Sequence, residues 1–164
     1  MNKMLKKISK LQEYESPILI CNEGLHGEIY RISDKHVAKV PHVGYNGIKN
    51  EERTTKRLFD LGISVPKPFG IEHISIRTWK KRMDKKAFVM EFAPGKTGYE
   101  LIRSSNLHER YILFEKSKLL YFAELEKAER EGLDFEFDRV NLKNYIFDMN
   151  EKVKLIDFAT CSFN

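Results

Sequence analysis

Residues 18–40, ILICNEGLHGEIYRISDKHVAKV, give the clearest indication of the fold of this chain. The segment contains three short runs rich in apolar and β-branched side chains, at Ile18–Cys21, Glu28–Ile32 and His36–Val40. Two glycines lie between the first two runs and a Ser-Asp pair lies between the last two, and both compositions are typical of turns. We therefore expect a three-stranded antiparallel meander.

The sequence after this meander changes from strand patterns to helix patterns. Gly62 ends a helical pattern in which Glu51, Thr55 and Leu58 share one face. The VPKP sequence at 65–68 cannot continue a helix. The order of the predicted elements, with strands first and a long helix later, favours the α+β class. We expect helices at Met4–Gln12, Lys49–Leu61 and Leu107–Arg130, and further strands at Phe69–Arg77, Ala87–Phe92, YIF (145–147) and VKLI (153–156).

Composition limits the kinds of protein that this chain can be. Its 164 residues, 41% hydrophobic and 32% charged, fit one globular domain. No uncharged apolar run approaches the roughly 18 residues of a membrane span, and residues 1–12 interleave lysine with apolar residues, unlike a signal peptide. Cys21 and Cys161 form no pattern typical of a disulfide framework or a zinc site. We expect no membrane partner and a cytoplasmic location.

The net charge of +5 is modest and indicates solubility more than a specific partner. Basic residues gather at Lys3–Lys10 and again at Arg77–Lys86, around Trp79. The second cluster could attract phosphates or an acidic protein, or it could be the solvated tip of a hairpin. Nucleic acid is therefore a candidate partner only on the first of these interpretations.

The turn at residues 22–27 is the first candidate for a functional site. Its glycines, Gly24 and Gly27, allow backbone N–H groups to approach an anion with no Cβ in the way. An ordinary hairpin turn explains the same residues. Because a strand pattern follows the glycines, a dinucleotide fingerprint is disfavoured, and the sequence has no Gly-Lys-Ser/Thr of a P-loop.

Lys39 and two later polar residues add to this candidate. Lys39 interrupts an apolar strand pattern, and a buried ammonium needs an anionic partner, for which Glu51 and Glu52 on the next helix are the nearest carboxylates. In a half-exposed strand Lys39 could instead point to solvent. Asn144 and Asp157, 13 positions apart, supply oxygen ligands suited to magnesium. Together these features are typical of phosphoryl transfer.

Six motifs in order resemble the protein-kinase superfamily: NEGLHGEIY, HVAKV, the helix with Glu51, FVMEFAPG, NYIF and KLIDFA. The sequence LGISVPKP after the helix is most similar to the small atypical branch of RIO and KEOPS-complex kinases. The resemblance covers residues 19–159 and implies a two-lobed kinase-like fold. It implies an N-lobe at 1–92 with an antiparallel sheet and one helix, a hinge at 93–95, and a reduced helical C-lobe at 96–164.

The resemblance also implies roles for the residues of the first half. Gly24 and Gly27 would lie over the nucleotide phosphates, with Asn22 in place of the first glycine of the family's loop. Asn also accepts a positive φ, so this replacement is tolerable. Lys39 would hold the α- and β-phosphates and pair with Glu51.

The cofactors that the resemblance implies are ATP and Mg²⁺. Met90 would border the adenine pocket, and the Glu91 carbonyl and the Ala93 N–H group would hydrogen-bond the base. Asn144 and Asp157 would bind the magnesium ion.

The catalytic loop departs from the family pattern. The family's base stands five positions before the metal-binding Asn, where this chain has Arg139, which cannot accept a proton. Asp138 is one position earlier, in a loop about two residues longer than the family implies, and we take it as the catalytic base. The alternative role of Asp138 is a helix-capping or solvated loop carboxylate. If Arg139 instead replaces the base, the chain is a nucleotide-binding pseudokinase.

These residues predict an ATP-dependent phosphotransferase, a minimal serine/threonine protein kinase. The sequence ends five residues after Ala159, so we expect none of the helices that hold a peptide in larger kinases, and a partner complex would supply that surface. The alternatives are the pseudokinase and a basic RNA- or protein-binding adaptor that retains the fold. We also expect Tyr145 and the remaining aromatic side chains in the core. Cys21 is expected to be a small buried hydrophobe, with a redox switch as the alternative, and His26 to lie in solvent or against a phosphate.

Overall fold

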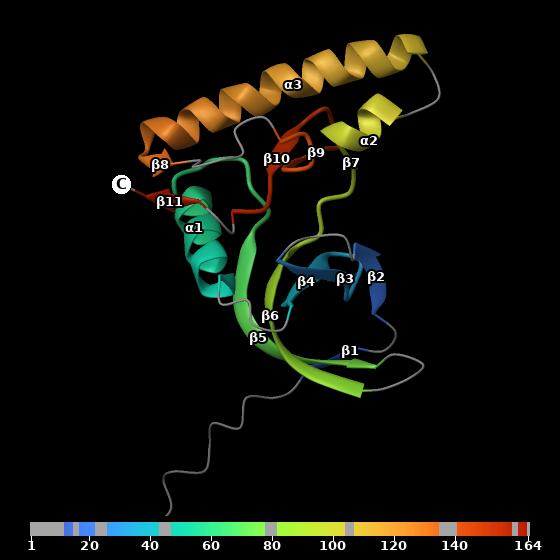
Figure 1. Ribbon diagram of the computed structural model, residues 1–164, viewed down its shortest axis with the longest axis vertical. Helices are drawn as coiled ribbons and strands as arrows, with labels where there is room; N and C mark the ends of the chain where they lie inside the picture. The colour runs from blue at the N-terminus through green and yellow to red at the C-terminus, as the bar shows by residue number, and fades with distance from the viewer. Residues whose placement is uncertain are drawn as a thin grey trace, which may run out of the picture.

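The computed structural model describes residues 12–14, 17–21, 26–42, 47–77, 82–103, 107–134, 141–158 and 161–163. These residues form a mixed α+β fold, which confirms the expected class. A large sheet with one helix packed against it occupies one part of the molecule, and a long helix with a three-stranded and a two-stranded sheet occupies the other (Figure 1).

The large sheet has the strand order β1-β5-β6-β4-β3-β2. The expected meander forms as three consecutive antiparallel strands, and the expected hairpin lies beside it. β1 is the exception in the sheet because it runs parallel to β5. The strands are β1 (Gln12–Tyr14), β2 (Ile18–Cys21), β3 (Gly27–Arg31), β4 (His36–Pro41), β5 (Pro68–Arg77) and β6 (Arg82–Glu91).

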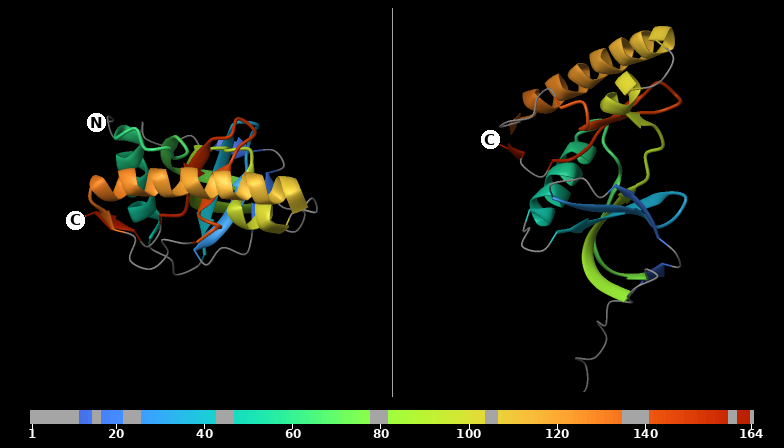
Figure 2. Two further views of the ribbon diagram at one scale, coloured as in Figure 1. Left: turned by 90° about the horizontal axis from the view of Figure 1, so that it is seen from above. Right: turned by 45° about the vertical axis from the view of Figure 1, so that its right-hand side comes forward.

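The large sheet must curl strongly. β1 and β2 lie at its opposite edges, which in a flat six-stranded sheet would be about 24 Å apart. Tyr14 and Ile18 are only four residues apart, so the chain between them spans at most about 14 Å. The views in Figures 1 and 2 show β5 and β6 bending across the other strands. The apolar cluster enclosed by this curl comprises Tyr30, Ile32, Ala38, Val40, Ile74, Ile76, Ala87 and Val89.

Helix α1 (Ile48–Asp60) packs against the outer face of this sheet. Its expected buried face is present, since Glu51, Thr55 and Leu58 are all at most 2% exposed. Gly62 follows with φ +76°, a conformation that favours glycine, and the helix ends there.

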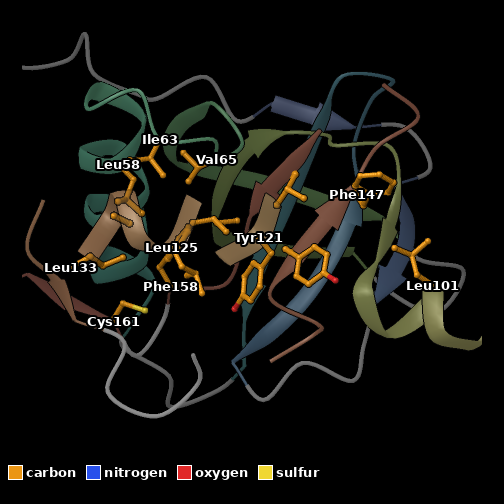
Figure 3. Close-up of a cluster of buried hydrophobic side chains, with 14 residues drawn as sticks. Leu58, Ile63, Val65, Leu101, Tyr121, Leu125, Leu133, Phe147, Phe158 and Cys161 are labelled. Atoms are coloured by element: carbon orange, nitrogen blue, oxygen red, sulfur yellow. The ribbon is translucent and has the colours of Figure 1, made fainter. Parts of the chain in front are cut away.

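The second part of the molecule has its own core beneath helix α3 (Leu107–Arg130). Figure 3 shows Tyr121 and Leu125 of α3 in this core, together with Leu58, Ile63 and Val65 from α1 and the segment after it. α1 therefore contributes to both parts. The remaining elements of this part are β7 (Lys96–Thr97), α2 (Gly98–Arg103), β8 (Leu133–Asp134), β9 (Tyr145–Phe147), β10 (Val153–Leu155) and β11 (Ser162–Phe163).

Several expectations about local structure are wrong. Gln12, placed at the end of a helix, begins β1, and the rest of that expected helix lies outside the described residues. β6 begins at Arg82 instead of Ala87, because the hairpin ladder continues to the Arg77–Arg82 pair. The short elements α2, β7, β8 and β11 were not expected.

Expectations about burial also need correction. Cys21 is exposed, because β2 lies at the sheet edge and all of its residues are exposed. Tyr145 is fully buried, as expected. Among the described residues, some other aromatic side chains are exposed and do not belong to the core: Phe59, Phe69, Tyr99 and Tyr111. None of the helices in the described part of the chain is long and apolar enough to cross a membrane.

Candidate functional site

Three charged side chains from distant parts of the sequence meet in one cluster. Lys39 Nζ donates a hydrogen bond to Glu51 Oε1 at 2.8 Å and another to Asp157 Oδ1 at 2.8 Å. The side chains of Lys39 and Glu51 are 7% and 3% exposed, whereas that of Asp157 is 40% exposed. The cluster is therefore closed on the side of α1 and open to solvent at Asp157.

The alternation of β4 explains why Lys39 faces α1. Ala38 and Val40 point into the cluster enclosed by the curled sheet, so their neighbours in sequence point to the opposite face. Val37 on that face packs with Ile48, the first residue of α1. Lys39 shares the face, which turns it toward the helix and away from solvent. Of the two candidate carboxylates on α1, Glu51 is the one that Lys39 contacts.

The charges of the cluster depend on one another. Burial alone would lower the pKa of Lys39, but the carboxylates of Glu51 and Asp157 outweigh burial and raise this pKa above its ordinary value. Burial raises the pKa of Glu51, an effect that Asp157 reinforces and Lys39 opposes. Lys39 is thus a cation held between two carboxyl groups. Glu51 Oε2 is buried and has no hydrogen-bond partner among the described residues.

Asp157 has an unusual backbone conformation for a residue with a side chain. Its φ is +64°, in the left-handed region, which costs roughly 1–3 kcal/mol in a residue other than glycine. Strain of this kind persists where surrounding contacts fix the residue, and it clusters at functional sites. Here the ion pair with Lys39 is one such contact.

The β9–β10 hairpin brings Asn144 beside this segment. The ladder pairs Leu155 with Tyr145, and one step beyond it the Ile156 N–H group donates to the Asn144 carbonyl at 2.8 Å. The backbones of Asn144 and Asp157 therefore lie at the same end of the hairpin, although they are 13 positions apart. Amide and carboxylate oxygens are suitable for Mg²⁺, which usually binds few protein oxygens together with substrate phosphates.

No cluster of three or more His, Cys, Asp or Glu side chains that could hold a metal occurs in the described ranges.

The glycine-containing turn is only partly described. Asn22 and Gly24 of this turn lie outside the described residues. So do Asp138 and Arg139 of the expected catalytic loop, and Trp79 of the second basic cluster. Gly27 has a structural reason to be glycine, since a Cβ there would lie 2.5 Å from the Val40 carbonyl oxygen. His26 is only partly in solvent, because its side chain is 24% exposed and Nδ1 lies 3.9 Å from Asp157 Oδ1. The end of the turn thus faces the charged cluster.

The segment at residues 91–95, which we call the connecting segment, leaves the large sheet at the end of β6. Met90 is 9% exposed and packs in an apolar cluster with Val37. The Glu91 N–H group donates to the Lys67 carbonyl at 2.9 Å. Ala93 is buried, and no hydrogen bond from its N–H group to another described residue is found.

No protein-family model matches this chain, and no curated protein matches it either. The function must therefore be inferred from the geometry of the site.

Sequence reasoning missed Lys154. Its Nζ atom donates to Glu91 Oε2 at 2.6 Å, which joins β10 to the connecting segment. Lys154 is paired across the hairpin with Ile146, so both side chains lie on the face of β9–β10 opposite the buried Tyr145 and Leu155. The only signal in the sequence is a lysine in the apolar run VKLI, the same signal that singled out Lys39.

Proposed function

We propose that this protein binds ATP with magnesium and transfers the terminal phosphoryl group, as a minimal serine/threonine protein kinase. The observation that carries the proposal is the buried Lys39–Glu51 ion pair with Asp157 as the second partner of the lysine. In protein kinases a lysine on the third strand pairs with a glutamate on the following helix, and an aspartate further along the chain binds magnesium. Lys39 lies on the third strand of the meander, and Glu51 on the helix that follows it.

Lys39 has a hydrogen-bonding group to spare for a phosphate. An ammonium group has three N–H donors, and Lys39 uses two of them on Glu51 and Asp157. The third can donate to a phosphate oxygen, while Glu51 holds the side chain in place. The raised pKa of Lys39 keeps it positively charged at neutral pH, which suits an anionic ligand.

Asp157 and Asn144 would hold the magnesium ion, since they are oxygen donors at the same end of the β9–β10 hairpin. Magnesium would supply neutralisation of the charge on the phosphates. The 40% exposure of Asp157 leaves one side of the carboxylate accessible to such a ligand. His26, beside Asp157, would have to share this space with the phosphates.

The connecting segment would hold the adenine. The Glu91 N–H group is already bonded within the protein, and the Phe92 N–H group donates to the Lys35 carbonyl at 2.8 Å. No hydrogen bond from the Ala93 N–H group to another described residue is found, which supports its expected use for the base together with the Glu91 carbonyl. In a two-lobed arrangement hinged at residues 93–95, Met90 would border the base. Ile146 would face the base from the β9–β10 hairpin, since it lies beside the connecting segment: a Cβ on Gly95 would be 2.7 Å from Ile146 Cγ2.

Calorimetry tests nucleotide binding. We expect a heat of binding when Mg–ATP is added to the wild type, and we expect this heat to disappear when Mg²⁺ is chelated. It should also disappear in a Lys39→Met/Glu51→Gln double variant. This double variant leaves no unpaired charge in the buried pair. Lys56→Met is the matched control, because it removes a lysine from an exposed ion pair with Asp60 on α1, the helix that carries Glu51. Absence of magnesium-dependent binding by the wild type at millimolar ATP would overturn the proposal.

Phosphoryl transfer is tested with labelled ATP and a mixture of peptides that contain Ser or Thr, with and without fractionated cell extract as a source of the partner complex. We expect Asp138→Asn to lower kcat by about 10²–10⁴-fold, the usual contribution of a general base, and to leave ATP affinity unchanged. A wild type that binds ATP tightly and transfers to no acceptor is instead a pseudokinase, with Arg139 in the position of the base.

A further inference from the structure

Glu91 is fastened by its carboxylate as well as by its backbone. One oxygen, Oε2, accepts a hydrogen bond from Lys154 Nζ at 2.6 Å and another from the Lys67 N–H group at 3.1 Å. Partial burial would raise the pKa of Glu91, but the hydrogen bonds from Lys154 and the Lys67 N–H group, together with the positive charges of both lysines, outweigh burial and lower this pKa. The carboxylate is therefore an anion that joins the connecting segment to β10 and to Lys67, the residue before β5.

The Glu91–Lys154 ion pair crosses between the two parts of the molecule. Glu91 ends the large sheet, and Lys154 lies on β10 of the other part. Three residues after Lys154, Asp157 makes the second ionic crossing, to Lys39. Two ion pairs thus hold one short segment, residues 154–157, against the large sheet at two points.

The pair lies where the proposed function places the nucleobase and not where it places the phosphates. Lys154 stands opposite Ile146 in the hairpin, and Glu91 supplies the carbonyl expected to bind the base. The phosphates belong at Lys39 and Asp157, which Glu91 and Lys154 do not contact in the structure. The two ion pairs are therefore suited to different halves of the same ligand.

We propose that Glu91 and Lys154 are positioning residues for the nucleobase: their ion pair fixes the connecting segment against the β9–β10 hairpin, so that the base is held between the Glu91–Ala93 backbone and Ile146. This inference rests on the proposed function, because it assigns a role within the proposed nucleotide site. Neither side chain touches the reacting atoms. The pair acts on the affinity for ATP through the geometry of the backbone groups that bind the base.

The consequence is a selective loss of affinity. A hydrogen bond that loses its alignment contributes less, and one protein hydrogen bond corresponds to roughly 2- to 10-fold in a binding constant. We expect Glu91→Gln and Lys154→Met each to weaken Mg–ATP binding by about 5-fold, with kcat changed less than about 2-fold. Both variants remove the same contact. We therefore expect the double variant to bind Mg–ATP as tightly as the single variant with the lower affinity.

Inorganic tripolyphosphate separates positioning from a general structural role. It carries the phosphates of ATP but no base, so its magnesium-dependent affinity should be the same in the wild type, Glu91→Gln and Lys154→Met. A variant that loosens the whole site would weaken both ligands. Lys56→Met serves as the control for loss of a surface lysine, and it should leave both affinities unchanged.

Calorimetry with Mg–ATP and with Mg–tripolyphosphate on these five proteins gives distinct outcomes. Weaker ATP binding with unchanged tripolyphosphate binding, and no further loss in the double variant, supports the inference. Unchanged ATP binding, equal weakening of both ligands, or additive losses in the double variant overturns it. A wild type that binds neither ligand overturns the proposed function first, and the inference with it.

Discussion

Two buried clusters of polar side chains, one in each part of the molecule, differ in charge and in how completely they are hydrogen-bonded. Beneath α3 the Tyr145 hydroxyl lies 3.0 Å from Ser117 Oγ, and Ser117 Oγ donates to the Phe114 carbonyl at 2.8 Å. Every group there is neutral, and Tyr145 also stacks on Tyr121 with ring centroids 4.5 Å apart. Between β4 and α1, Lys39 and Glu51 are charged, and one oxygen of Glu51 has no partner among the described residues.

The difference indicates which group stabilises the fold and which suits a ligand. A buried hydroxyl pair whose members are satisfied contributes modestly to stability. A buried ion pair gains little net stability over apolar side chains of similar volume, although removing one partner alone is costly. The Lys39 cluster also opens to solvent at Asp157. Variants of the two groups should therefore affect stability and activity in different proportions.

The largest effect is expected from Lys39→Met. It leaves the carboxyl group of Glu51 buried without a cation, which costs about 3–5 kcal/mol in the free energy of unfolding. The double variant Lys39→Met/Glu51→Leu should recover most of this loss, while neither protein binds Mg–ATP. Urea unfolding monitored by circular dichroism measures the first effect. A double variant as unstable as the single one would show that the pair itself stabilises the fold.

Asp157→Asn should affect activity and leave the fold intact. Asn accepts the left-handed backbone conformation of residue 157 and keeps an oxygen ligand, but it loses the charge that faces magnesium. We expect kcat for phosphoryl transfer to fall by about 10²–10³-fold, as when a single charge-stabilising group is removed. Asp60→Asn, in an exposed ion pair on α1, is the control. Full activity of Asp157→Asn would exclude Asp157 as a magnesium ligand.

Tyr145→Phe should show the reverse pattern. It removes one neutral hydrogen bond and keeps the stacked ring, so we expect a loss of about 1 kcal/mol in unfolding free energy. Mg–ATP affinity should stay within about 2-fold of the wild type. Thermal unfolding and calorimetry measure the two quantities, and a large loss of ATP affinity would mean that the two polar groups are coupled through the β9–β10 hairpin.

The smallest effect concerns pH and Glu91. Its pKa is lowered in the folded protein, so its contribution to stability is present above its unfolded pKa of about 4.3 and is lost as the pH falls through the folded pKa. Because the side chain of Glu91 is 39% exposed, the difference in unfolding free energy between the wild type and Glu91→Gln should be below about 1 kcal/mol at pH 7. Thermal unfolding between about pH 7 and 3 should show this gap closing, and a gap that widens toward acid would contradict the assignment.

The elements with strong local signals were predicted from the sequence. The meander, α1 and α3 have clear periodicity or turn residues, and Glu51 shares a helix face with Leu58, which is why it could be preferred to Glu52. β7 and β11 are two-residue strands whose pairing partners are distant in sequence, so no local pattern encodes them.

The finer features of the site depend on tertiary contacts. The positive φ of Asp157 follows from the path of the chain after β10 and leaves no mark in the residue types. Lys154 and Glu91 are 63 positions apart and both partly exposed, and surface ion pairs of this kind have no sequence signature. The exposure of Cys21 follows from the position of β2 at the sheet edge, which depends on the strand order.

Helix α1 belongs to both cores, and this has a consequence for cooperativity. Leu58 is buried in the core beneath α3, and Asn50 Nδ2 donates to the Cys161 carbonyl at 2.9 Å. Just beyond the helix, the Leu155 N–H group donates to the Ser64 carbonyl. Glu51 therefore cannot swing away from Lys39 unless these contacts break as well. Amide protons of α1 should consequently exchange with solvent through the same global opening as those of α3, and the chain should unfold as a single unit.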